Sequence, residues 1–97
     1  MSSRPNRQEH FDSQIAKFTH ARRRSVGISQ AVLAEELGID QATVSKVEHG
    51  LRKLSAGELM QWLEALGMPT DQAMEELSSL WRQYGQRPST LWEDNEI

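Results

Sequence analysis

Apolar residues recur along the chain at steps of three and four, the spacing of one face of an α-helix. Phe11, Ile15 and Phe18 show it first, in a segment expected to be helical from about residue 8 to residue 24 and to stop before Gly27. No segment shows the alternation of apolar and polar positions that is typical of a half-buried strand. The pattern therefore predicts an all-α fold.

Four further helical segments are predicted from N-cap residues and glycine stops. They run from Ser29 to Gly38, from Asp40 to before Gly50, from Ser55 to Gly67 and from Pro69 to Gly85. The third of these opens with a capping box, in which Ser55 and Glu58 each bond the other's backbone N–H. Residues 86–97 show no periodicity. We therefore divide the chain into residues 1–85, with a core at 10–67 and an added fifth helix at 70–84, and an acidic tail at 86–97.

The second and third segments meet the packing demands of a helix-turn-helix. Ala34 is small where the helices are expected to cross, Gly38 stands where the turn needs a positive φ, and Ile39 is expected to plug the turn. The residues expected to join the two helices are Leu33, Leu37, Val44 and Val47. The outer face of the third helix then carries small or hydrogen-bonding side chains, a face that can enter a DNA major groove.

The combined spacing closely resembles the DNA-binding domain of phage repressors and Cro-type bacterial regulators, the XRE-like family. The likeness rests on Arg23, Gly27-Ile-Ser-Gln30, Val44-Ser-Lys-Val-Glu-His-Gly50 and Arg52-Lys-Leu-Ser55, and it covers about residues 10–67. The resemblance implies a five-helix, phage-repressor-like fold with helices 2 and 3 as the helix-turn-helix. It also implies a bacterial or phage-encoded transcriptional regulator, most simply a dimeric repressor that reads an operator with its third helix.

Roles for individual residues follow from this resemblance. Gln30 is expected to clamp a phosphate and to brace Gln41, which is expected to bond an adenine edge. The other implied DNA contacts are Ala42 on a thymine methyl, Thr43 and Ser45 on a base or phosphate, Lys46 on guanine or phosphate, and Arg52 and Lys53 on the backbone. Ala42 stands where the phage proteins frequently have a polar residue, so the bases that are read stay open.

Arg23 and Glu48 are implied by the family spacing to form an ion pair that holds the first helix to the third. The flanking Arg22 and Arg24 are expected to be solvated, with contact to a DNA phosphate as the alternative. Arg4 and Arg7 belong to a polar lead-in that is either an arm around the duplex or a frayed terminus.

Net charge alone argues against a nucleic-acid partner, because the whole chain carries −3 at pH 7. The charge is divided unevenly, however. Residues 1–54 hold nine Lys and Arg against six Asp and Glu, whereas residues 55–97 hold two against eight. The basic half contains the helix-turn-helix, so double-stranded DNA remains the predicted partner, and the acidic half is expected to face a different one.

Several classes of protein are disfavoured by composition. The chain has no Cys, which excludes a disulfide scaffold, a thiolate metal site and a Cys nucleophile. Its three His are not at metal-ligand spacings, and no Ser/His/Asp triad is indicated, so we expect no metal, no cofactor and no enzyme. No apolar run approaches the roughly 20 residues that span a bilayer, and Met1–His10 has no signal-peptide core. We therefore expect no membrane partner and a cytoplasmic location.

The fifth helix carries an apolar stripe that is either core or interface. We expect it to form a homodimer through Met74, Leu77, Leu80, Trp81 and Tyr84, because four preceding helices leave little core to cover. The tail combines Leu91 and Trp92 with acidic residues. Its composition permits a second hypothesis, an antitoxin-type module that autoregulates through the same domain and binds a protein partner through its C-terminal part.

Overall fold

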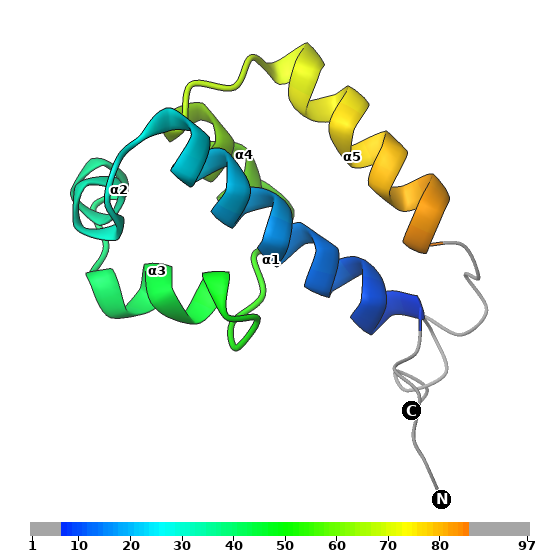
Figure 1. The fold of residues 1–97 in the computed structure, drawn as a ribbon, viewed down its shortest axis with the longest axis horizontal. Helices are drawn as coiled ribbons and strands as arrows, with labels where there is room; N and C mark the ends of the chain where they lie inside the picture. Colours follow the sequence, from blue (N-terminus) through cyan, green and yellow to red (C-terminus); the bar gives the residue numbers. More distant parts are fainter. Residues whose placement is uncertain (1–6, 86–97) are drawn as a thin grey trace, which may run out of the picture.

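The computed structural model describes residues 7–85, and within them the chain is helical and contains no strand. The helices are α1 (Arg7–Val26), α2 (Gln30–Leu37), α3 (Gln41–Glu48), α4 (Ala56–Ala65) and α5 (Thr70–Tyr84) (Figure 1). The prediction of a five-helix all-α fold is confirmed, with helix ends within two residues of the expected ones. None of these helices is both long and apolar enough to cross a membrane.

The helix starts coincide with the predicted caps. The side chains of Ser29 and Asp40 each accept a hydrogen bond from the backbone N–H three residues further on, at 3.1 and 2.9 Å. Ser55 and Glu58 form both bonds of the capping box. Gly38 ends α2 with φ 73°, a left-handed conformation that glycine adopts without steric cost. The tight turn between α2 and α3 thus has a local, sequence-encoded cause.

The main core lies where α2, α3 and α4 meet. Its buried members are Leu33, Ala34, Val44, Val47, Trp62 and Leu66. Ile39 contributes less than expected, since it stays 37% exposed. Trp62 of α4 packs in this cluster, and together with Ile39 it lines a small open cavity of about 120 Å³.

Helices α1 and α5 lie side by side and close the other half of the molecule (Figure 1). The ring of Phe11 meets the ring of Trp81 edge to face, with centroids 5.1 Å apart, and His10 meets Tyr84 at 4.8 Å. Helix α5 ends at Gly85, whose backbone lies directly against the side chain of Trp81. A Cβ atom at position 85 would collide with the indole ring. A second buried cluster, Leu63, Met68 and Ala73, joins α4 to α5.

Arg22 corrects one expectation, because its side chain is bonded rather than solvated. Its Nε donates to the carbonyl oxygen of Leu66 at 3.2 Å and its Nη2 to that of Gly67 at 3.0 Å. The last carbonyls of a helix lack partners within the helix and carry partial negative charge. The guanidinium of Arg22 therefore caps the end of α4, a contact across 44 residues of sequence.

We predict that Arg22→Ala lowers the free energy of unfolding by about 1–3 kcal/mol, since it removes two hydrogen bonds from a charged donor and leaves the α4 carbonyls unpaired. Urea denaturation measures the change. Arg24→Ala is the matched control, because Arg24 is exposed and carries the same charge. Equal stability of the two variants would contradict the capping role.

Candidate nucleic-acid interface

Helix α3 lies at the surface with one face buried and the other open. Val44, Val47 and Glu48 point into the protein. On the opposite side, Gln41, Ala42, Lys46 and His49 are exposed, and Thr43 and Ser45 are half-buried. We call these last six residues the outer face of α3. All the residues that sequence analysis assigned to α3 as DNA contacts belong to it.

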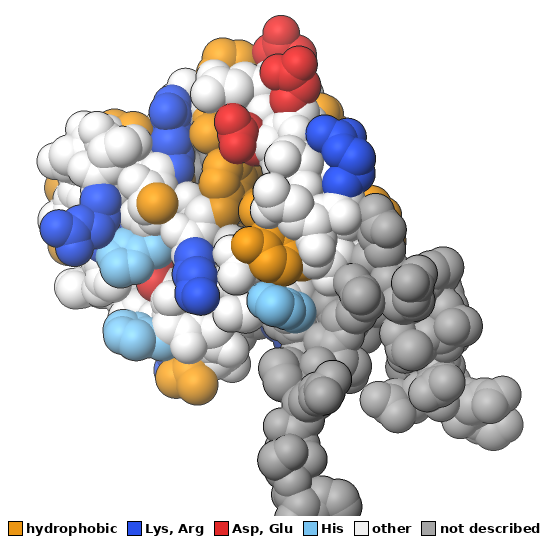
Figure 2. Space-filling view, turned by 45° about the vertical axis from the view of Figure 1, so that its right-hand side comes forward, with side chains coloured by type: hydrophobic (Ala, Val, Ile, Leu, Met, Phe, Trp, Pro, Cys, Tyr) orange, Lys and Arg blue, Asp and Glu red, His pale blue; other side chains and the backbone are white. Residues whose placement is uncertain are grey.

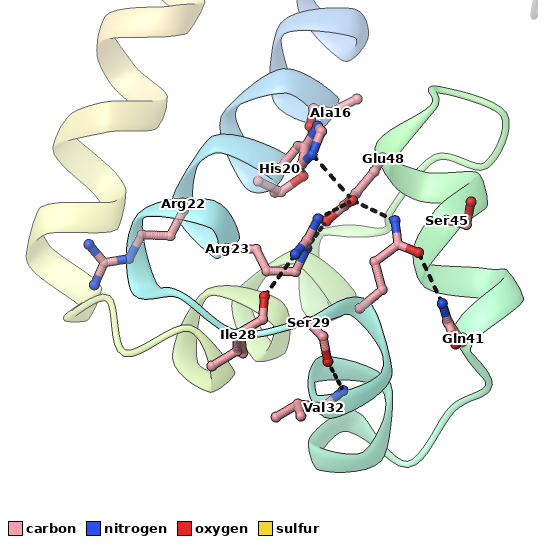
Figure 3. A network of polar contacts seen from close by, with 12 residues as sticks. Ala16, His20, Arg22, Arg23, Ile28, Ser29, Val32, Gln41, Ser45 and Glu48 are labelled. Carbon is pink, nitrogen blue, oxygen red and sulfur yellow. Dashed lines mark hydrogen bonds and ion pairs between the residues drawn. The ribbon is translucent and has the colours of Figure 1, made fainter.

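A buried carboxylate fixes α3 to α1. The side chain of Glu48 is only 1% exposed, and it accepts hydrogen bonds from Nε and Nη2 of Arg23 at 2.6 and 3.1 Å (Figure 3). The remaining terminal nitrogen of Arg23 donates to the carbonyl oxygen of Ile28 at 2.8 Å. One guanidinium therefore links α1, α3 and the segment that leads into α2.

Gln30 extends this network to the first residue of α3. Its Nε2 donates to Oε1 of Glu48 at 2.9 Å, and its Oε1 accepts from Nε2 of Gln41 at 3.4 Å (Figure 3). The structure thus brings Gln30 and Gln41 together, as the resemblance implies. The bond between Gln30 and Glu48 was not expected from the sequence. Neither was the position of His20, whose Nε2 lies 3.7 Å from Oε1 of Glu48.

The network keeps Glu48 ionised although it is buried. Burial acts to raise the pKa of this carboxyl group, but hydrogen bonds from Arg23 and Gln30 and the charge of Arg23 outweigh burial, so the pKa lies below 4.5. The hydrogen bond to Glu48 in turn raises the pKa of Arg23. At neutral pH the pair is fully charged, and each partner compensates the buried charge of the other.

Three side chains of the outer face, those of Thr43, Ser45 and His49, take part in local bonds. The Thr43 hydroxyl donates to Asp40, which lowers the pKa of that N-cap carboxyl group. Nδ1 of His49 lies 2.8 Å from the carbonyl oxygen of Ser45. The ammonium group of Lys46, by contrast, is exposed and makes no hydrogen bond or close ion pair with the side chains described for residues 10–85, although its charge helps to lower the pKa of Asp40. It is therefore the cation of this face that a ligand can reach directly.

The two predicted phosphate contacts in the loop after α3 already have acidic partners. Arg52 bonds both carboxylate oxygens of Glu58, at 3.1 and 3.0 Å, and this contact lowers the pKa of Glu58 to about 2. Lys53 lies 3.2 Å from Asp12 of α1. The two pairs connect the loop to α4 through Glu58 and to α1 through Asp12, and neither acidic partner was identified from the sequence.

The apolar stripe of α5 is divided between core and surface. Leu77, Leu80 and Tyr84 are half-buried, whereas Met74 and Trp81 are 45% and 38% exposed. Figure 2, which brings the α5 side forward, shows a band of apolar side chains with acidic side chains above it. The helix therefore packs within its own chain and still leaves apolar surface uncovered.

Two predictions concern residues that the structure does not describe. The lead-in residue Arg4 and the acidic tail at residues 86–97 lie outside the described residues, so a protein partner at the tail stays a prediction. Within residues 7–85, no three His, Asp or Glu side chains are grouped so that they could hold a metal ion.

Comparison with known proteins gives two matches. Residues 20–72 match the helix-turn-helix family, a span that includes the whole of α2, α3 and α4. The chain is also 28% identical over 68 residues to an uncharacterized transcriptional regulator in the ATPase CF(0) region of Rhodospirillum rubrum. That alignment covers 70% of this chain and 63% of the relative, so the chain spans less than two thirds of the relative's length. No solved structure matches the chain.

We predict that Arg23→Met lowers the free energy of unfolding at pH 7 by about 3–5 kcal/mol, because it leaves the buried Glu48 charge without its main partner. The pH dependence has a definite sign. In the wild type the lowered pKa of Glu48 adds stability that is present above pH 4.5 and is lost as the pH falls through the folded-state pKa. In the variant, burial raises the pKa of Glu48 because Arg23 no longer opposes it. Protonation of Glu48 then removes the free-energy penalty of the buried charge.

The stability difference between the wild type and Arg23→Met should therefore be largest near neutral pH and shrink toward about pH 4. Thermal or urea unfolding over this pH range measures it. The double variant Arg23→Met/Glu48→Leu is the control, since it removes both charges and should recover much of the loss. A difference that does not change with pH would contradict the stranded-charge explanation.

Proposed function

Because the chain belongs to the helix-turn-helix family, we propose that it is a sequence-specific DNA-binding transcriptional regulator. In this proposal α3 enters the major groove of an operator, and the protein works in the cytoplasm of a bacterium, encoded by the bacterium or by a phage. The description of the Rhodospirillum rubrum relative as a transcriptional regulator supports the same function. A binding function of this kind needs no catalytic residues and no cofactor.

The observation that carries the proposal is the exposed outer face of α3. The opposite side of this helix is anchored through Glu48, which Arg23 and Gln30 bond. Base edges in the major groove offer hydrogen-bond donors and acceptors, which amide and ammonium side chains can pair with. Gln41 offers such an amide and is braced by Gln30 at 3.4 Å, and Lys46 offers an exposed ammonium group that no described carboxylate holds in a close ion pair. Ala42 is exposed beside them and suits a thymine methyl group.

Contacts to the DNA backbone flank this face in the proposal. Gln30 lies at the start of α2, where free backbone N–H groups favour phosphate, and Arg52 and Lys53 lie in the loop after α3. Such contacts set the register of the protein on the duplex and supply salt-dependent affinity. The net charge of −3 leaves little general attraction to DNA, so the specific contacts must carry more of the affinity.

A homodimer completes the proposal. Two half-sites about 34 Å apart bind two recognition helices, and a symmetric dimer supplies these from identical chains. The exposed Met74 and Trp81 of α5, with the half-buried Leu77, Leu80 and Tyr84 beside them, support α5 as the contact surface. Bound to an operator, such a dimer excludes polymerase, so repression is its simplest effect.

We predict that selection from random DNA yields a two-fold site and that Lys46→Ala weakens binding to this site by about 1–3 kcal/mol while relaxing preference at one position. Titration with the selected duplex measures affinity, and the stoichiometry shows whether two chains bind. Lys17→Ala is the matched control, an exposed lysine on α1. If both variants bind the selected site like the wild type, α3 does not read DNA through Lys46.

We further predict that Glu58→Gln tightens binding to all sequences alike and steepens the salt dependence by about one unit of slope, because it frees Arg52 from its carboxylate partner. Arg52→Ala should act in the opposite direction on both quantities. Binding to the selected duplex and to an unrelated one at several salt concentrations measures these slopes. Glu64→Gln, at an exposed acid elsewhere on α4, controls for net charge. Equal slopes in all variants would show that Arg52 does not contact phosphate.

A further inference from the structure

An apolar groove of about 540 Å³ opens between α1, the loop after α3, α4 and α5. Its lining includes Phe11, Ile15, Leu54, Leu59 and Leu77, and each of these side chains is only half-buried. Side chains of this kind gain free energy when a further apolar group removes them from water. The volume lies within the range of pockets that hold drug-sized molecules, so it can accept the side chains of a short peptide segment.

One part of the groove is basic. Arg52 and Lys53 line it together with the apolar residues, against a single acidic residue of the lining, Asp12. Each has an acidic partner, but a lysine ammonium group has three N–H donors, and Lys53 has a single ion pair, with Asp12. The groove therefore suits a segment that combines large apolar side chains with carboxylates.

The described chain ends beside this groove. Phe11, which lines the groove, meets Trp81 edge to face at 5.1 Å, and the backbone of Gly85 passes so close to Trp81 that a Cβ atom would collide with its ring. Twelve residues follow Gly85, and among them Leu91 and Trp92 precede three acids, Glu93, Asp94 and Glu96. At roughly 3.5 Å per residue, the chain from Gly85 to Leu91 can reach about 20 Å.

We propose that residues 91–96 of this chain occupy the groove. Leu91 and Trp92 cover its apolar lining, and the acids that follow them meet Arg52 and Lys53. A short tether gives the segment a millimolar effective concentration, so a weak intrinsic affinity is enough to fill the groove. The consequence for DNA rests on the proposed function: carboxylates at Arg52 and Lys53 compete with phosphate, so the tail lowers the affinity for DNA.

Docking can be tested without DNA. Because the chain has no Cys, Asn95→Cys carries one spin label in the full chain. We expect the label to broaden the amide signals of groove residues such as Ser13 and Lys53 but not those of Glu36 on α2, and we expect Leu91→Ala/Trp92→Ala to abolish the broadening. Broadening must be absent when labelled chains are mixed with separate isotope-enriched chains. No broadening, or broadening in the mixture, overturns the proposal, the latter because a second copy then fills the groove.

Competition is tested by neutralising two acids. If the tail occupies the groove nine-tenths of the time, only one-tenth of the chains can bind DNA, and the apparent affinity falls about tenfold. The variant Glu93→Gln/Asp94→Asn should therefore bind a duplex of arbitrary sequence about three to ten times more tightly than the wild type. Glu75→Gln/Glu76→Gln on α5 is the control, with the same change in charge outside the groove. Equal gains in the two variants overturn the competition. If no form binds any duplex, the proposed function fails, while the spin-label result still decides docking.

Discussion

The buried carboxylate of Glu48 is the group on which the rest of the structure depends. An ionised side chain at 1% exposure is stable only because Arg23 and Gln30 bond it, and these two residues come from different helices. The same contacts determine where α3 lies relative to α1 and α2. A hydrophobic contact would hold the helices together as well, but it has no direction. The charge-assisted bonds fix orientation, which a recognition helix needs if its side chains are to meet base edges in register.

Much of this arrangement could be predicted because its causes are local. Cap residues, the glycine at position 38 and the spacing of apolar residues each act within a few residues, and all five helices were located from them. The contacts that escaped prediction join distant parts of the chain. Arg22 caps α4 across 44 residues, and Lys53 pairs with Asp12 of α1. No local pattern identifies such partners, because the neighbours of an arginine in the sequence do not show whether its side chain is exposed or caps a distant helix.

The candidate site was predicted in the same uneven way. The residues on the outer face of α3 follow from helical periodicity once Val44 and Val47 are placed inside. Their bonding partners do not follow. Arg52 belongs to a basic segment in the sequence, yet in three dimensions its charge is neutralised by Glu58. Of the two cations Arg52 and Lys46, only Lys46 is open to a ligand. Sequence charge therefore indicates which half of the chain holds the candidate interface, but it does not say which cations are available.

The two ends of helix α1 contact different helices. His10 and Phe11 meet α5 near one end, while Arg22 and Arg23 hold α4 and α3 near the other. A helix rises 1.5 Å per residue, so these groups lie about 18 Å apart on a single rigid element. The contact with α5 and the contact with α3 therefore involve separate turns of α1. Under the proposed function, the spacing between half-sites would depend on one end of α1 and the choice of bases on the other.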